Sequence, residues 1–198
     1  MPRRLIALLG ILLLSGCALF DAPRSTPLPG GAQWQLLSPD QLGRSISVTQ
    51  RVTGNFNGQS VALLFYLEVT PDRLALVGTT PDGSELFSLE KTASALNVHA
   101  TPLLPKQLRP EMVLADLQMA FWPAAAIEKN LRDTDLQLRE QNEAVGMRRT
   151  ITQQSTQQNG EPVITIDYDS ADRWRGSVRF EQHVWHYSYV VETLQSSP

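Results

Sequence analysis

The chain of 198 residues is long enough for one domain with a sizeable core, and its formal net charge of −3 argues against a nucleic-acid partner. It contains one cysteine, Cys17, which excludes an internal disulfide or a metal site made of several thiolates. Stability must therefore come from an apolar core.

The first 17 residues resemble the signal and lipidation sequence of bacterial lipoproteins. Two arginines precede an apolar run, residues 5–14, which is shorter than the roughly 20 residues that a membrane-spanning helix needs. The tetrapeptide 14–17, Leu-Ser-Gly-Cys, then ends in the cysteine. The resemblance implies cleavage after residue 16, acylation of Cys17 and attachment to a lipid bilayer. Because Ala18 stands where an Asp would favour the inner membrane, it also implies delivery to the outer membrane, on the periplasmic side.

These features predict four segments: a signal peptide (1–16), the lipidated Cys17 with a polar tether (17–33), a single domain (34–194) and a frayed tail (195–198). The tether is rich in Pro, Gly and small polar residues, which favour a linker over a packed core. A short helix is expected next, with Ser38 as its N-cap, Gln41 completing a capping box and Gly43 ending the turn.

Alternating apolar residues predict a first group of antiparallel strands. Residues 46–56 and 59–70 form a hairpin through Asn57-Gly58, a pair typical of type I′ turns. The second of these strands carries apolar residues on both faces, among them Leu64 and Tyr66, so we expect both faces to be covered. Residues 74–80 and 85–92 form another hairpin, and 96–100 a fifth strand.

The spacing then becomes helical. Glu111 to Trp122 places Val113, Leu117 and Phe121 on one face, and Pro123 is expected to be the first residue of a second short helix. Strands resume in residues 136–140, 145–153, 163–169, 178–181 and 185–191.

About ten antiparallel strands with a helical insertion predict a mainly β fold: a curved sheet or half-open β-barrel with the helices over its concave face. Such a sheet either encloses an apolar cavity or is filled by its own side chains, and the sequence leaves both open. The candidate cavity residues are Phe65, Leu67, Val113, Leu117, Phe121, Trp122, Trp185 and Tyr187.

The sequence offers little for catalysis or for metal binding. His183 and His186 would face opposite sides of an extended strand, and His99 is distant in the chain. Ser170 and Asp172 could be combined with His183 as a hydrolytic set, but turn residues explain them more simply. The acidic stretch 168–173 lacks the spacing of a calcium loop. We therefore expect no enzyme, no cofactor and no metal.

The order of parts resembles the LolA/LolB class of lipoprotein-localisation factors, and an uncharacterised family of outer-membrane lipoproteins related to it. Residues 114–123 and 86–89 carry most of this resemblance. It implies a half-open barrel with a helical lid and an interior that receives acyl chains. The hairpin 79–85 is polar throughout, unlike the protruding apolar loop of LolB-type receptors, so another hydrophobic cargo, such as an aryl-polyene-type product, fits as well.

Two functions are consistent with these observations. The first is a membrane-tethered, non-enzymatic protein that binds or transfers a lipid, a lipoprotein acyl chain or a lipid-linked product at the outer membrane. The second is a structural or accessory lipoprotein with a solid core that binds another envelope protein.

Overall fold

The fold is taken from a computed structural model, which describes residues 25–56, 59–154 and 160–197. The predicted signal peptide, Cys17 and the Asn57-Gly58 turn lie outside the described residues. Twelve strands and two α-helices make up the described part.

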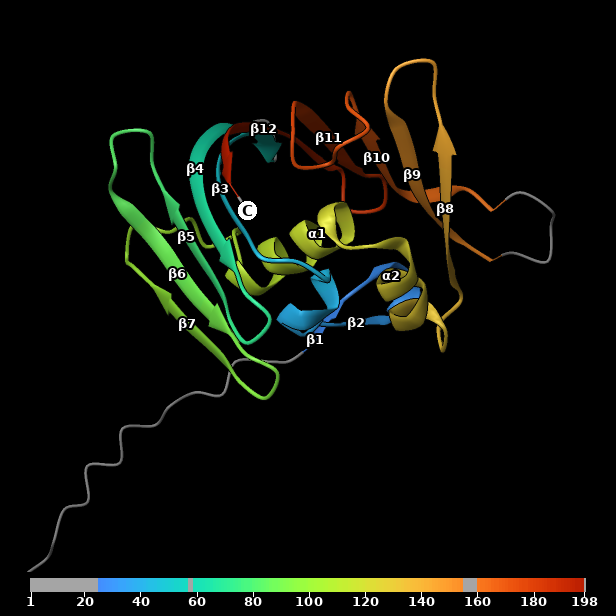
Figure 1. Cartoon of the computed structure of the whole chain (residues 1–198), viewed down its shortest axis with the longest axis horizontal. Helices are drawn as coiled ribbons and strands as arrows, with labels where there is room; N and C mark the ends of the chain where they lie inside the picture. The colour runs from blue at the N-terminus through green and yellow to red at the C-terminus, as the bar shows by residue number, and fades with distance from the viewer. Residues whose placement is uncertain (1–24, 57–58, 155–159, 198) are drawn as a thin grey trace, which may run out of the picture.

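One antiparallel sheet of ten strands dominates the molecule (Figure 1). One meander runs outward from the centre of the sheet: β3 (Ile46–Phe56), β4 (Gln59–Val69), β5 (Leu74–Thr79), β6 (Glu85–Lys91) and β7 (Leu96–Ala100). A second meander runs back from the opposite edge: β8 (Leu136–Asn142), β9 (Met147–Gln153), β10 (Pro162–Tyr168), β11 (Ser177–Gln182) and β12 (Tyr187–Ser197). The two meanders join where β12 pairs with β3.

Two helices connect the two edges of this sheet. Helix α1 (Pro110–Phe121) follows β7 and lies in the hollow of the curved sheet, and α2 (Ala124–Leu131) leads into β8 (Figure 1). The prediction of an open, curved antiparallel sheet of about ten strands with helices over its concave face is confirmed. Pro123 is the N-cap of α2 rather than its first helical residue.

The strands follow the alternation of the sequence. In β3, Ile46, Val48 and Val52 are buried, whereas Ser47 and Arg51 on the opposite face are exposed. The β5–β6 turn contains Gly83 at φ 89°, a backbone conformation that glycine adopts without steric cost. The expectation that β4 is covered on both faces is wrong for the described residues, because Tyr66 on the convex face is 44% exposed.

A small N-terminal arm packs beside the helices. It consists of β1 (Ser25–Pro27), a 3-10 turn (Pro29–Gly31), β2 (Gln33–Gln35) and a second 3-10 turn (Pro39–Leu42). Ser38 makes no capping hydrogen bond to the backbone of the second turn, so the predicted capping box does not form, although Gly43 does end this turn at φ 78°.

The arm corrects the predicted boundary between tether and domain. The Pro- and Gly-rich segment 29–31 is not a linker but a tight turn, closed by a hydrogen bond of 2.8 Å from the Leu28 amide to the Ala32 carbonyl. Thr26 and Leu28 are buried, so the folded part begins at Ser25 or earlier.

Gln118 of α1 fixes this arm. Its side-chain oxygen accepts hydrogen bonds from Trp34 Nε1 (3.2 Å) and from the Leu37 amide (2.8 Å), and its Nε2 donates to the Leu37 carbonyl (2.9 Å). Gln118 and Trp34 are fully buried. A buried amide whose groups are all paired fixes one geometry, since any other would leave polar atoms unsatisfied.

The predicted tail is also corrected. After a register shift between Thr193 and Gln195, the residues Gln195 to Ser197 continue β12 and pair with Thr49 to Ser47 of β3. The backbone hydrogen bonds of the sheet hold this segment although its side chains are polar and exposed.

Arg149 of β9 binds the C-terminal end of α1. This fully buried side chain donates from Nη1 to the carbonyls of Met119 and Ala120 (3.2 Å for Ala120) and from Nη2 to that of Trp122 (3.0 Å). Its Nε lies 2.9 Å from Glu140 Oε1. The last carbonyls of a helix have no partners within the helix and carry partial negative charge, so a guanidinium is a favourable cap.

Replacing this arginine tests how strongly the fold depends on it. We expect Arg149→Ala to lower the free energy of unfolding by about 3–5 kcal/mol, because Glu140 and the helix carbonyls lose a buried partner. Urea unfolding followed by circular dichroism measures the change. Arg148→Ala, which removes only exposed ion pairs with Asp167 and Glu143, is the matched control and should cost about 1 kcal/mol or less. Equal losses in the two variants would contradict this role.

Candidate functional site

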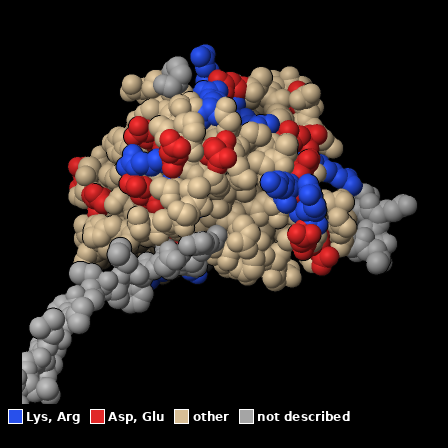
Figure 2. All heavy atoms as spheres, turned by 60° about the horizontal axis from the view of Figure 1, so that its bottom comes forward, with Lys and Arg blue, Asp and Glu red and all other residues tan. Residues whose placement is uncertain are grey.

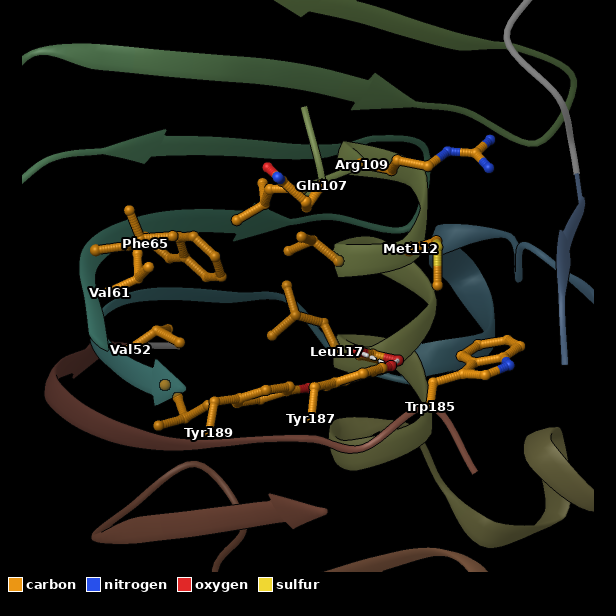
Figure 3. Close-up of a pocket in the computed structure, with 16 residues that line it drawn as sticks. Val52, Val61, Phe65, Gln107, Arg109, Met112, Leu117, Trp185, Tyr187 and Tyr189 are labelled. Carbon is orange, nitrogen blue, oxygen red and sulfur yellow. Dashed lines mark hydrogen bonds between the residues drawn. The ribbon is translucent and has the colours of Figure 1, made fainter. Parts of the chain in front are cut away.

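A cavity of about 250 Å3 lies between α1 and the concave face of the sheet. Its walls come from the start of α1 and from the centre of the sheet, strands β3, β4 and β12 (Figure 3). Apolar side chains dominate them; Val52, Val61 and Phe65 of the sheet face Leu117 of the helix across the space.

The cavity exists because a side chain is missing from the concave face. Along one row of the sheet, Phe180, Tyr189, Gly54 and Val61 are neighbours on four adjacent strands. Gly54 presents only a hydrogen atom between Tyr189 and Val61, and all three line the cavity. Protein interiors are normally close-packed, so a gap of this size requires such an omission.

Aromatic rings form the wall on the β12 side. Tyr189 stacks on Phe180 with ring centroids 4.8 Å apart, and Tyr187 lies parallel to Tyr189 at 6.4 Å. Because β-strand residues two apart share a face, these rings extend in a row toward the turn that carries Trp185. Trp185 is therefore not a strand residue, as the alternation predicted, but lies in this turn and is 38% exposed.

The rim of the cavity is partly open to solvent. Gln107 and Arg109, which precede α1, are exposed, and Met112 and Val113 in its first turn are half-buried. The side chain of Arg109 extends away from the cavity (Figure 3). A ligand can thus reach the interior at the N-terminal end of the helix.

One acidic group lines the otherwise apolar space. Asp116 of α1 is 8% exposed, and its Oδ2 and Oδ1 accept hydrogen bonds from the Tyr187 hydroxyl at 3.0 and 3.2 Å. Burial raises the pKa of Asp116 to about 7, against smaller opposing effects of hydrogen bonds from Tyr187 and Tyr189. Burial also raises the pKa of both tyrosines, and the Asp116 charge adds to this.

The structure brings together five of the eight predicted cavity residues: Phe65, Val113, Leu117, Trp185 and Tyr187 line the space. The other three do not line it. Leu67 is buried further along β4, where it pairs with Val48 and Leu76. Phe121 and Trp122 lie at the C-terminal end of α1, away from the cavity, and Phe121 stacks on Trp174 with centroids 4.5 Å apart. The core at this end of the helix is filled.

Sequence reasoning missed Gly54, Tyr189 and Asp116. Gly54 continues the alternation of Val48 and Val52, so a glycine at an apolar position was a signal of missing volume. Asp116 stands on the same helical face as Val113 and Leu117, where a carboxylate is unexpected.

The other candidate groups do not converge in the described residues. His183 lies in the turn before β12 and its Nε2 is 2.9 Å from Thr165 Oγ1, whereas Ser170 Oγ accepts a hydrogen bond from the Asp172 amide. Asp172 in turn accepts one from the Trp174 amide, which is typical of a turn. No group of three potential metal ligands occurs in the part of the chain that the structure describes.

A comparison with protein families assigns this chain to one of them. A family model described as "Protein of unknown function (DUF3261)" matches residues 47–195, which include nearly the whole ten-stranded sheet. The chain belongs to this family. No curated protein matches the DUF3261 chain.

Two solved structures are similar to it only distantly. One is a domain described as outer membrane lipoprotein-sorting from Vibrio parahaemolyticus (9% identity, 77% of this chain and 84% of that one, TM-score 0.34). The other is a DUF1329 family protein from Desulfovibrio piger (11% identity, 80% and 88% covered, TM-score 0.29). Neither helix in the described ranges of the DUF3261 chain is long and apolar enough to cross a membrane.

The raised pKa of Asp116 predicts a pH dependence of stability. Between about pH 4 and pH 7, Asp116 keeps its proton in the folded protein but releases it in the unfolded chain. The free energy of unfolding therefore falls as the pH rises through this range, by at most about 1.4 kcal/mol per pH unit. Above pH 7 the group has no further effect. Asp116→Asn, which carries no titrating group at this position, should therefore exceed the wild type in stability by a larger margin at about pH 8 than at about pH 5. Urea unfolding at both pH values tests this; the same difference at both would contradict it.

Proposed function

We propose that this protein binds the apolar chain of a lipid or lipid-linked molecule in the cavity between α1 and the sheet, without catalysing a reaction on it. The observation that carries the proposal is the unfilled space itself: the concave face omits a side chain at Gly54, which lies between Tyr189 on one neighbouring strand and Val61 on the other.

The volume of the cavity fits a single alkyl chain rather than a bulky ligand. Pockets for drug-sized molecules measure roughly 300–1,000 Å3, and an engineered apolar cavity of roughly 150 Å3 in another protein binds benzene. A space of about 250 Å3 lies between these values. Each methylene group that leaves water for such a space contributes about 0.8 kcal/mol, so a chain of several methylenes would bind measurably.

An N-terminal lipid anchor would hold the protein at a membrane. Residues 14–17 resemble the lipidation sequence of bacterial lipoproteins, the lipobox, which makes Cys17 the proposed acylated residue and the outer membrane of a Gram-negative bacterium, on its periplasmic side, the proposed location. Between Cys17 and the start of β1 at Ser25 the chain spans 25 − 17 = 8 residues, about 28 Å at full extension. The cavity would then stay close to the bilayer, which is the source or the destination of the proposed ligand.

The absence of convergent catalytic groups in the described residues supports a binding role, because a hydrolase needs a nucleophile beside a base. An accessory role in binding another envelope protein is the alternative.

Filling the cavity tests the binding proposal. Gly54→Leu places a side chain in the gap, and Gly54 is not among the positive-φ glycines of the described residues, so the backbone should accept it. We expect the variant to lose photo-crosslinking to a diazirine-bearing dodecanol while its melting temperature stays within a few degrees of the wild type, because the substitution removes the space and not the fold.

The matched control is Thr53→Leu, which adds the same side chain at the neighbouring, exposed position on the convex face and should leave labelling unchanged. If wild type, Gly54→Leu and Thr53→Leu all remain unlabelled, or all label equally, the cavity is not the binding site and the accessory role becomes the better explanation.

The membrane attachment has its own test. Cys17→Ser should abolish incorporation of radioactive palmitate and move the protein from the detergent phase to the aqueous phase in detergent partitioning, because acylation and cleavage at a lipobox both depend on the thiol. Palmitate label that persists in the variant would exclude Cys17 as the attachment site.

A further inference from the structure

The wall of the cavity combines a buried carboxylate with aromatic rings. Asp116 is the only acidic residue among those that line it, and Tyr187 and Tyr189 lie beside it in a parallel row (Figure 3). Asp116 is therefore not one charge in a solvated surface cluster; it is a single group directed into an apolar space.

No cation in the described residues neutralises this carboxylate. Its partners there are tyrosine hydroxyls, and none of the influences on its protonation comes from a lysine or an arginine. Arg109, the basic residue at the rim, directs its guanidinium away from the cavity. Figure 2 shows lysine and arginine side chains on the outer face of the domain, close to acidic ones.

The other side of Asp116 also lacks a positively charged side chain in the described residues. A small space of about 10 Å3 separates the carboxylate region of α1 from β1 and β10, and its lining includes Thr26, Ile164 and Gln182 but no charged side chain apart from Asp116. A buried carboxylate with no cationic partner costs free energy in its ionised form, and a strongly perturbed carboxyl group that lines a cavity is a candidate for ligand binding.

The remaining bonding capacity of the site fits a cation. An ionised carboxylate has about four positions that accept hydrogen bonds and none that donates one. The Tyr187 hydroxyl uses only part of the acceptor positions of Asp116, so the rest can face a positively charged group. The faces of tyrosine and tryptophan rings attract ammonium groups, most strongly where water is excluded. Tyr187, Tyr189 and Trp185 provide such rings within the same lining.

We infer that the cavity selects an amphiphile with a positively charged amine or quaternary ammonium head, which Asp116, Tyr187 and Tyr189 bind while the alkyl chain lies among Val61, Phe65 and Leu117. This inference rests on the proposed function, because it names the ligand class for the same cavity. The ammonium group could belong to a free alkylamine or to a zwitterionic phospholipid.

Head-group selectivity tests the inference. The full chain, held in phosphatidylglycerol nanodiscs, whose lipids carry no ammonium group, is photo-crosslinked with dodecyl probes of identical diazirine-bearing chains that end in trimethylammonium, phosphocholine, carboxylate or hydroxyl groups. We expect the trimethylammonium probe to label at about tenfold lower concentration than the hydroxyl probe, which corresponds to one charge-assisted contact. The phosphocholine arm separates the two sources: labelling as strong as that by trimethylammonium points to a phospholipid, and weaker labelling to a free amine.

Asp116→Asn supplies the matched variant. It should lose the preference for the ammonium head while retaining labelling by the hydroxyl probe, since the apolar walls are unchanged. A measurement on the wild type alone gives a second check. Lowering the pH from about 8 to about 5 neutralises Asp116 and should remove the same preference; burial raises the pKa of Tyr187 and Tyr189, so both stay neutral over this range, and the guanidinium of Arg109 points away from the cavity.

The possible outcomes separate the two proposals. Equal labelling by all four probes, or a preference for the carboxylate probe, would overturn the inference and leave the binding function intact. Failure of every probe to label the wild type would overturn both. An ammonium preference that survives in Asp116→Asn would also overturn the inference, because the selectivity would then come from another group.

Discussion

The position of α1 depends on one buried cation. Arg149 of β9 meets the C-terminal carbonyls of the helix, and Tyr168 of the neighbouring β10 donates its hydroxyl to the Ala120 carbonyl in the same turn. Gln118, one turn earlier, holds the N-terminal arm. All three attachments lie in the second half of the helix. The residues of α1 that line the cavity begin earlier, at Met112, and the polar contact among them is the one between Asp116 and Tyr187.

The core is closely packed around the C-terminal end of α1, whereas nearer the N-terminal end of the helix it contains the cavity. Around Phe121 and Trp122 the side chains are closely packed and buried. Around Gly54 they are not, and the Asp116 carboxylate of α1 lines the cavity that results. A fixed helix end beside a solid core can support an empty space at the other end without loss of the overall fold, because the strands keep their own hydrogen bonds.

The sequence predicted elements whose pattern is local. Strict alternation gave β3, and the change to a helical spacing gave α1 within one residue of its observed bounds. It failed where structure depends on partners far away in the chain. Residues 25–33 have the composition of a linker but fold because Gln118 and the face of α1 receive the arm that they form. Residues 195–197 are polar but form a strand because β3 offers an unpaired edge.

The candidate site shows the same limit. Large apolar residues such as Phe65 and Leu117 could be predicted to line an interior because they lie on buried faces. A cavity, however, arises from register: it requires knowing that Gly54 lies opposite Tyr189 on one side and Val61 on the other. No single strand contains that information. The hydrogen bond between Asp116 and Tyr187 likewise could not be predicted from a local pattern, because the two residues are 187 − 116 = 71 positions apart in the chain.

The pairing of β3 with β12 has a consequence for how the chain reaches this fold. Val52 lies opposite Val191, so the central seam of the sheet joins residues separated by 191 − 52 = 139 positions. Each meander contains only local hairpins and can assemble early, whereas closing the seam requires a long loop and is intrinsically slow. Until then β3 and β12 are both open edges beside uncovered apolar faces, which is the arrangement most prone to aggregation. A nascent chain of this topology therefore needs protection until its two halves have met.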